Sequence, residues 1–134
     1  MAKSFDVVQC REGWSKLYQP IIDEVINHDI SQVNNNKRIG IESIYEEDGE
    51  LRIDLIQEEN AYSSLFSKIR DAELASVKTC EYCGATENVG TTMNFHFETC
   101  CKSCWESHIL PKRPQSVWKD YDTQKSYSIT QNLK

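Results

Sequence analysis

Two Cys-x-x-Cys pairs constrain this chain more than any other feature of its sequence. The first pair is Cys80 and Cys83, followed directly by a glycine, and the second is Cys101 and Cys104. A Cys-x-x-Cys-Gly turn directs two thiolates to one point, and two such pairs supply the tetrahedral four-sulfur shell of a structural Zn²⁺ site. The spacing between the pairs is typical of zinc sites. We therefore expect one structural Zn²⁺ bound by these four cysteines.

Two neighbouring residue types leave alternatives for the ligand set. Cys100 stands directly before Cys101, and only one of the two can be the third ligand. The repeated Cys-x-x-Cys spacing favours Cys101, which leaves Cys100 and Cys10 outside the site. His96 and His108 are further candidates because a histidine can replace a cysteine in such a shell.

Other uses of four cysteines are less consistent with the sequence. Two disulfides need an oxidising compartment. A redox-active pair is expected in a thioredoxin-like strand and helix context, which this region does not show. An iron–sulfur cluster also takes four cysteines, and the spacing alone leaves it open.

The cysteine region predicts its own local structure. A tight turn at residues 80–84 comes first, and apolar alternation predicts a strand over residues 91–99 with its Phe rings on one face and His96 on the other. A short helix over residues 105–110 should end at Pro111. Turn, hairpin and a helix that carries the last ligands is the order of a treble-clef zinc module.

The cysteine spacing resembles that of a GATA-type DNA-binding finger. Such a finger needs basic residues to reach phosphates and bases. Between the first and last cysteine of the pattern, Lys102 is the one basic residue, against Glu81, Glu87 and Glu98. We therefore interpret the site as a structural support for the fold and not as a DNA-reading element.

Apolar periodicity before the cysteines predicts a small α+β unit. One amphipathic helix should begin near Gln19, because Pro20 is tolerated only close to a helix start, and should end at His28. Strands are expected over 38–45 and 51–55, with Ile39, Ile41, Tyr45, Leu51, Ile53 and Leu55 alternating about an Asp-Gly turn. Asn60 can cap a second helix that runs to Ser76 and includes Phe66 in its apolar face.

The predicted fold class is therefore α+β, with two helices packed on an antiparallel hairpin and followed by a treble-clef-like four-cysteine module. The expected divisions are residues 1–79 for the α+β unit, 80–110 for the zinc module and 111–134 for an extended tail held by Trp118 and Tyr121. With 134 residues and 39% hydrophobic content, the chain has a modest core that a metal would supplement.

Composition also restricts the compartment and the partner. The N-terminus lacks the apolar segment of a signal peptide, no run reaches membrane-spanning length, and six cysteines then favour a reducing cytoplasm. The net charge of −6 argues against a nucleic-acid groove. We expect a cytoplasmic protein without membrane contact.

The order of motifs resembles that of a loose group of small, uncharacterised bacterial and prophage proteins. The motifs are Cys10-Arg-Glu-Gly-Trp-Ser-Lys-Leu17, Gly49-Glu-Leu-Arg-Ile53, Ser76-Val-Lys-Thr-Cys-Glu-Tyr-Cys-Gly84 and Thr99-Cys-Cys-Lys-Ser-Cys104. The resemblance covers roughly residues 8–106 and implies a bacterial protein stabilised by zinc, with no particular chemistry. This chain departs from the group where a basic segment before the Leu-Arg strand is replaced by the acidic stretch 45–49.

The sequence does not predict an enzyme. Catalytic zinc keeps an open position, whereas four cysteines close the shell. The His-x-Glu of a zinc deaminase, a phosphate-binding Gly-rich loop and a Gly-x-Ser-x-Gly motif are all missing from the sequence.

An acidic run after the first helix suggests a protein partner. Between residues 46 and 59, seven acidic residues accompany one basic residue, Arg52. Such a run can be a solvated face, but it also suits a basic partner, as in an immunity protein that inhibits a nuclease-type toxin. The alternative is a nucleic-acid-associated or transcriptional accessory protein that uses the zinc module and the basic residues Lys112, Arg113, Lys119 and Lys125 of its tail. The predicted partner surface is Glu46, Glu47, Asp48, Glu50, Asp54, Glu58 and Glu59.

Overall fold

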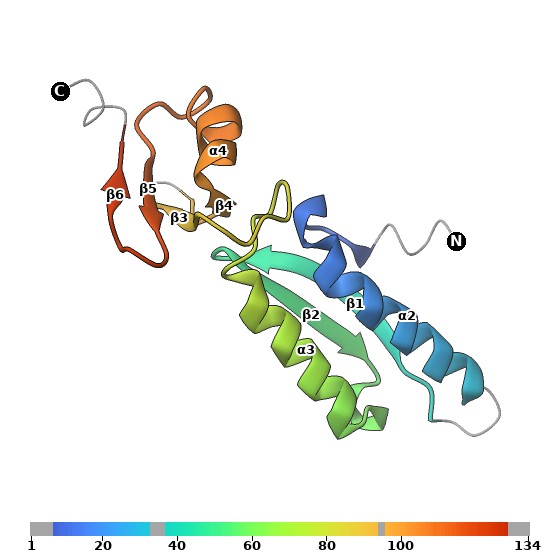
Figure 1. Ribbon diagram of the computed structural model, residues 1–134. Helices are drawn as coiled ribbons and strands as arrows, with labels where there is room; N and C mark the ends of the chain where they lie inside the picture. Colours follow the sequence, from blue (N-terminus) through green and yellow to red (C-terminus); the bar gives the residue numbers. More distant parts are fainter. Residues whose placement is uncertain (1–6, 33–36, 94–95, 129–134) are drawn as a thin grey trace.

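The computed structural model describes residues 7–32, 37–93 and 96–128, and Figure 1 shows two units that follow each other along the chain. It contains α-helices and antiparallel sheets, which confirms the α+β class. The elements of the first unit are a 3-10 turn at Glu12–Trp14, α2 at Ser15–Ser31, β1 at Gly40–Glu47, β2 at Glu50–Ile56, a 3-10 turn at Glu58–Asn60 and α3 at Ser63–Ser76.

The first helix starts earlier than the sequence predicts. α2 begins at Ser15 and contains Pro20, although proline removes one backbone hydrogen bond and was expected to mark the helix start. Trp14, directly before the helix, is fully buried, and its indole N–H donates to the carbonyl of Thr79 at 2.8 Å. This anchor fixes the chain direction one turn before the proline, and the buried apolar face of α2 outweighs the lost hydrogen bond.

The hairpin forms as predicted about its Asp-Gly turn, but its alternation changes part-way along β1. Asp48 and Gly49 both have positive φ, as a two-residue hairpin turn requires. The pairing register shifts between Ile41 and Ser43, which marks a β-bulge. The bulge turns Ile44 into the core, where it is fully buried. Tyr45, which the predicted alternation places on the same face as Ile41, therefore lies on the opposite face from Ile44.

α3 packs beside α2 on the hairpin, as Figure 1 shows. The predicted Asn60 cap is wrong, because the helix begins at Ser63 and the Asn60 amide instead donates to the carbonyl of Arg38 at 2.9 Å. Phe66, expected in the apolar face, is exposed. The buried residues of this core are Trp14, Tyr18, Ile21, Ile22, Val25, Ile39, Ile44, Leu51, Ile53, Leu65, Ile69 and Ala72.

The second unit is a four-stranded antiparallel sheet, in the order β4 (Thr99–Cys101), β3 (Val89–Met93), β5 (Val117–Asp120) and β6 (Ser126–Tyr127). The prediction of a single strand over residues 91–99 is wrong, because two paired strands occupy this region. Phe95, which was expected in that strand, lies outside the described residues. The elements are β3 at Val89–Met93, β4 at Thr99–Cys101, α4 at Lys102–Cys104, a π-helical turn at Trp105–Ile109, β5 at Val117–Asp120 and β6 at Ser126–Tyr127.

The predicted extended tail is also wrong for residues 117–127, which supply two strands of the sheet. Gly90 explains why β5 can dock on β3, since a Cβ at this position would lie 2.1 Å from the carbonyl of Lys119. Trp118 is buried as expected, and its indole N–H donates to the carbonyl of Cys100 at 2.9 Å. Tyr121, the second expected anchor, is exposed.

The two units meet where the first Cys-x-x-Cys turn contacts the start of α2. The amide of Gly13 donates to the carbonyl of Glu81 at 2.7 Å. A Cβ on Gly13 would lie 2.3 Å from the carbonyl oxygens of Cys80 and Glu81, so only glycine permits this approach. On the other side, the hydroxyl of Thr99 donates to the carbonyl of Gly49 in the hairpin turn.

Candidate metal centre

Four cysteines from three parts of the second unit converge on one point. Cys80 and Cys83 lie on the turn between α3 and β3, Cys101 ends β4, and Cys104 ends α4. Their sulfur atoms all lie within 4.8 Å of one another, with Cys83 Sγ and Cys101 Sγ 3.8 Å apart. The four side chains could hold a metal ion, and they are the four that the Cys-x-x-Cys spacing singles out.

Backbone hydrogen bonds form the first cysteine turn. The amide of Gly84 donates to the carbonyl of Cys80 at 2.9 Å, and the amide of Cys80 donates to the carbonyl of Ala85 at 2.8 Å. Gly84 has a φ of +81°, a conformation that glycine adopts without strain. The glycine after the second cysteine is therefore required by the geometry that brings the two sulfur atoms to one side.

The four thiols have unequal environments. Cys83 is exposed, while Cys80, Cys101 and Cys104 are buried. Burial alone would raise the pKa of Cys83, but hydrogen bonds from the Ala85 backbone and from the other thiols outweigh it and lower this pKa. Burial raises the pKa of Cys104 above its ordinary value. A cation bound among the sulfur atoms would favour the thiolate forms that a metal needs.

The alternative ligands lie outside this sulfur cluster. Cys100 is fully buried on the sheet, and burial raises the pKa of its thiol. His108 stacks on the ring of Tyr82, with centroids 4.8 Å apart and planes at 5°. His96 is exposed, and its Nε2 atom lies 3.7 Å from a carboxylate oxygen of Glu46.

Two buried glutamates beside the cysteines were not identified from the sequence as site residues. Glu81 and Glu98 are each 2% exposed. Burial raises the pKa of Glu81 to about 8. Burial opposes ionisation of Glu98 as well, but hydrogen bonds from Tyr82 and Arg113 outweigh it and lower its pKa. Only their position between the two units distinguishes them from the exposed glutamates, and a single sequence does not show that position.

The predicted acidic surface is divided by the structure. Glu47, Asp48 and Glu50 lie at the hairpin turn, and Arg52 forms ion pairs with Glu47 and Glu50. Glu58 and Glu59 lie beyond the far end of β2, about 20 Å away at roughly 3.3 Å per strand residue. The seven carboxylates therefore do not form one compact patch.

Glu46 and Asp54 occupy different faces of the hairpin. Glu46 is directed towards the second unit, accepts a hydrogen bond from the amide of Gly49 at 2.6 Å, and has a side chain only 17% exposed. Asp54 is exposed on β2 and pairs in register with Ser43. The outer face of the hairpin, which we define as Ser43, Tyr45, Glu47, Glu50, Arg52 and Asp54, lies opposite the buried face.

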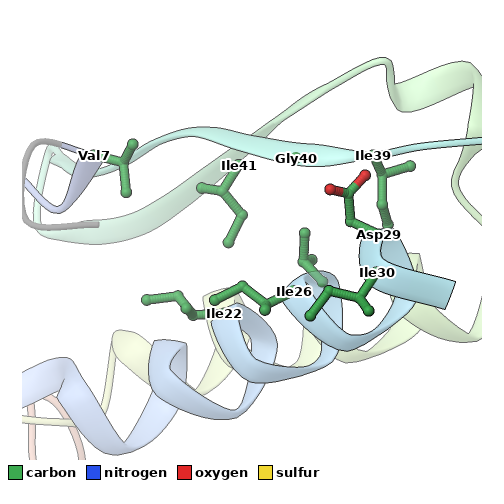
Figure 2. Close-up of a pocket in the computed structure, with 9 residues that line it drawn as sticks. Val7, Ile22, Ile26, Asp29, Ile30, Ile39, Gly40 and Ile41 are labelled. Atoms are coloured by element: carbon green, nitrogen blue, oxygen red, sulfur yellow. The ribbon is translucent and has the colours of Figure 1, made fainter. Parts of the chain in front are cut away.

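An apolar groove of about 290 Å³ opens between α2 and β1, and Figure 2 shows aliphatic side chains from both elements converging on it. Ile26 and Ile30 are its most exposed apolar members. Asp29, at one end, is already held by two hydrogen bonds from Arg38, of 2.7 and 3.0 Å. The lining of the groove thus supplies apolar contacts and one carboxylate whose charge is already neutralised, and such a lining does not suit acid–base chemistry.

No protein-family model, curated protein or solved structure matches this chain. In the part of the chain that the structure describes, each helix is too short or too polar to cross a membrane. The resemblance to bacterial and prophage proteins and the protein-binding role both remain predictions.

Proposed function

We propose that this protein binds one structural Zn²⁺ and acts without catalysis, by binding a basic protein partner through the hairpin. The metal holds the second unit, and the first unit presents the binding surface. The observation that carries the proposal is the outer face of the hairpin, where Tyr45 lies among carboxylates on the side opposite the helices.

The donor set supports zinc. Four sulfur atoms within 4.8 Å of one another match the preference of Zn²⁺ for tetrahedral thiolate ligation. Four protein ligands also fill the coordination shell, so a bound zinc would have no position for a water molecule or a substrate. This is the basis for proposing a structural role for the metal.

The outer face of the hairpin has the residue types of a protein interface. Tyr45 pairs in register with Arg52, and tyrosine and arginine are enriched where interfaces bind most tightly. Glu47 and Asp48 add exposed negative charge at the turn. Carboxylates around such a centre speed the association with a basic surface.

A basic toxin of the nuclease type is the partner class that we propose, with this protein as its inhibitor. A nuclease carries positive charge to hold its substrate, so an acidic surface suits its active face. The alternative, a nucleic-acid accessory protein, receives less support from the structure. Arg113 of the basic tail is paired with the buried carboxylate of Glu98, and the ammonium group of Lys102 lies over the ring of Tyr127, so both cations already have partners within the protein.

The metal assignment is tested by elemental analysis of the purified protein. We expect about one Zn²⁺ per chain. Cys101→Ser should lose the metal, whereas the neighbouring Cys100→Ser should retain it and serves as the matched control. Metal lost from Cys100→Ser and retained in Cys101→Ser would reverse the ligand assignment, and iron with sulfide in place of zinc would contradict the metal.

The surface is tested with the partner recovered from the native host and identified by mass spectrometry. The triple variant Glu47→Lys, Asp48→Lys, Glu50→Lys should slow association by about tenfold or more at low salt, with less effect at high salt. The double variant Glu58→Lys, Glu59→Lys reverses charge at the far end of the hairpin and should change the rate much less. The nucleic-acid alternative would be supported if the triple variant bound the partner at the parent rate while the double variant Lys112→Glu, Lys119→Glu lost binding.

A further inference from the structure

The four cysteines of the metal centre differ in their access to solvent. Cys80, Cys101 and Cys104 are buried, whereas Cys83 is exposed. All six cysteines lie in the described part of the chain, and Cys83 is the one exposed member among them. A reagent from solvent has to reach a sulfur atom before it can react there. Such a reagent therefore meets the metal centre first at Cys83.

A pocket of about 240 Å³ lies beside this residue. A water molecule takes up about 30 Å³ of the liquid, so the pocket has room for a reagent of a few atoms. Cys101 borders a separate pocket, but this residue is only 7% exposed. The pocket beside Cys83 forms where the first cysteine turn faces the start of α2, and its lining includes Tyr82, Cys83, Gly84, Gly13, Ser15 and Lys16.

A second sulfur lies within reach of Cys83. Cys101 Sγ is 3.8 Å from Cys83 Sγ, and the two residues come from different elements, β4 and the turn before β3. A disulfide has an S–S distance of about 2.05 Å, so the two sulfur atoms have to approach by about 2 Å. Because the Cys83 side chain faces solvent, it has room for this movement.

We propose that Cys83 is a modification site, at which a hydroperoxide oxidises the metal centre and produces a Cys83–Cys101 disulfide that releases the bound zinc. This inference rests on the proposed Zn²⁺ site. Zinc deprotonates the thiols that coordinate it, so access to each sulfur, and not its titration, decides which one reacts first.

The reaction balances in two steps. The Cys83 sulfur attacks one oxygen of hydrogen peroxide, the O–O bond breaks, and Cys83 becomes a sulfenic acid while hydroxide leaves. The Cys101 sulfur then attacks the Cys83 sulfur, so that the S–S bond forms and the S–O bond breaks with loss of a second hydroxide. Each hydroxide takes a proton from the buffer. Two thiolates are thereby oxidised to one disulfide, and the peroxide is reduced to water.

The oxidised turn is also the place where the two units meet. The amide of Gly13 donates to the carbonyl of Glu81 at 2.7 Å, and the indole of Trp14 donates to the carbonyl of Thr79 at 2.8 Å. Metal binding energy supports the folded form of such a turn, and release of the metal removes this support. We therefore expect oxidation to weaken the contact between the units, with faster hydrogen exchange at the Gly13 amide.

The test is peroxide treatment of the zinc-loaded protein in a Cys10→Ser background, which removes a free thiol outside the centre. Zinc release is followed with a chromogenic chelator, and dimedone traps the sulfenic acid for peptide mapping by mass spectrometry. We expect about one Zn²⁺ released per chain and the first dimedone adduct at Cys83. Without dimedone, the product should be the Cys83–Cys101 disulfide, and dithiothreitol with added zinc should restore the starting state.

Two variants make the assignment specific. Cys83→His keeps a zinc ligand but removes the exposed sulfur, so it should slow peroxide-driven zinc release by about tenfold or more. Cys104→His makes the same exchange at a buried position and is the matched control, with release close to the parent rate. If a histidine variant does not hold zinc, the order of dimedone labelling in the Cys10→Ser protein decides the question.

Three results would overturn the proposal: a dimedone adduct at a buried cysteine before Cys83, equal release rates from the two histidine variants, or zinc retained at a peroxide concentration that oxidises the metal-free protein. A disulfide between Cys80 and Cys83 would overturn the choice of Cys101 as the partner. Absence of zinc from the reduced protein would instead contradict the proposed metal site, so the two failures are distinguishable.

Discussion

The cores of the two units of this protein are built from different types of side chain. The core of the first unit is formed mainly by aliphatic and aromatic side chains from two helices and a hairpin, with Ile44, Leu51 and Leu65 fully buried. The buried aliphatic side chains in the core of the second unit are Val89 and Ile109. The rest of this core is formed by Trp105, Trp118 and the buried cysteines Cys80, Cys100, Cys101 and Cys104. Apolar contact is therefore abundant in the first unit and limited in the second.

This difference identifies the second unit as the one to which a bound metal would contribute most. Each fully buried aliphatic side chain contributes about 1.5–3 kcal/mol, so the first unit has a hydrophobic driving force of its own. The second unit buries Glu81, Glu98 and Thr99, which must be paired to avoid a desolvation cost. A structural zinc contributes about 10–16 kcal/mol to the folding of small domains, which would compensate for so small a core.

The largest expected effect is the loss of the metal. Chelation, or Cys104→Ser, should unfold the second unit and expose Trp105 and Trp118, while α2 and α3 stay protected from hydrogen exchange. The measurements are tryptophan fluorescence and exchange rates for each unit. Cys100→Ser is the control, because its sulfur lies outside the cluster. Retention of second-unit protection after complete metal removal would contradict the comparison.

The second effect concerns the apolar core of the first unit. Leu51→Ala removes a fully buried side chain from β2 and should lower the free energy of unfolding by about 2–5 kcal/mol. The metal should remain bound in this variant below its melting temperature. Leu74→Ala, at an exposed position of α3, should cost much less. Similar losses from the two substitutions in thermal unfolding would show that the core is misassigned.

Much of this architecture follows from short sequence patterns. The cysteine spacing and its glycine identify four side chains that the structure brings together, and the Asp-Gly dipeptide places the hairpin turn. Features that depend on distant contacts were missed. A β-bulge changes the face of Ile44, and docking on Gly90 converts the expected tail into strands β5 and β6. The alternation of apolar residues within one segment predicts neither the bulge nor the added strands, because both depend on pairing with another strand.

The site shows the same limit. Glu81 lies next to a cysteine in the sequence, where a surface charge is expected. In the structure its side chain is buried, at the place where the amide of Gly13 contacts the Glu81 carbonyl between the units. The acidic run reads as one surface, yet strand β2 separates its two ends. Ligand spacing is local and can be predicted, whereas burial and surface continuity arise from the packing of separate units.

The third effect is expected at the contact between the units. Gly13→Ala would place a Cβ 2.3 Å from two backbone carbonyl oxygens and should lower the free energy of unfolding by about 1–3 kcal/mol. Gly40→Ala is the control, since its Cβ would meet Ile56 at 3.6 Å, an ordinary contact. In denaturant, the Gly13 variant should also separate the unfolding transitions of the two units. A single unchanged transition would indicate that this contact does not couple them.

The smallest effect is a pH dependence within the first unit. The carboxylate of Glu73 on α3 accepts a hydrogen bond from the amide of Ile53 at 3.1 Å, and burial raises the pKa of this carboxyl despite that bond and the nearby Arg52. The negative charges of Glu50 and Asp54 raise the pKa of this carboxyl further.

The folded state therefore holds this proton more tightly than the unfolded chain, in which the pKa of a glutamate is about 4.3. The contribution of Glu73 to stability is present below that value and is lost as the pH rises through the folded pKa. Glu73→Gln keeps an oxygen for the Ile53 amide but does not titrate, so the difference in unfolding free energy between variant and parent should shift in favour of the variant as the pH rises across this window. Urea unfolding at a series of pH values measures the difference, with the exposed Glu59→Gln as control. A difference that stays constant with pH, or moves in favour of the parent, would show that Glu73 titrates alike in both states or is stabilised as the carboxylate.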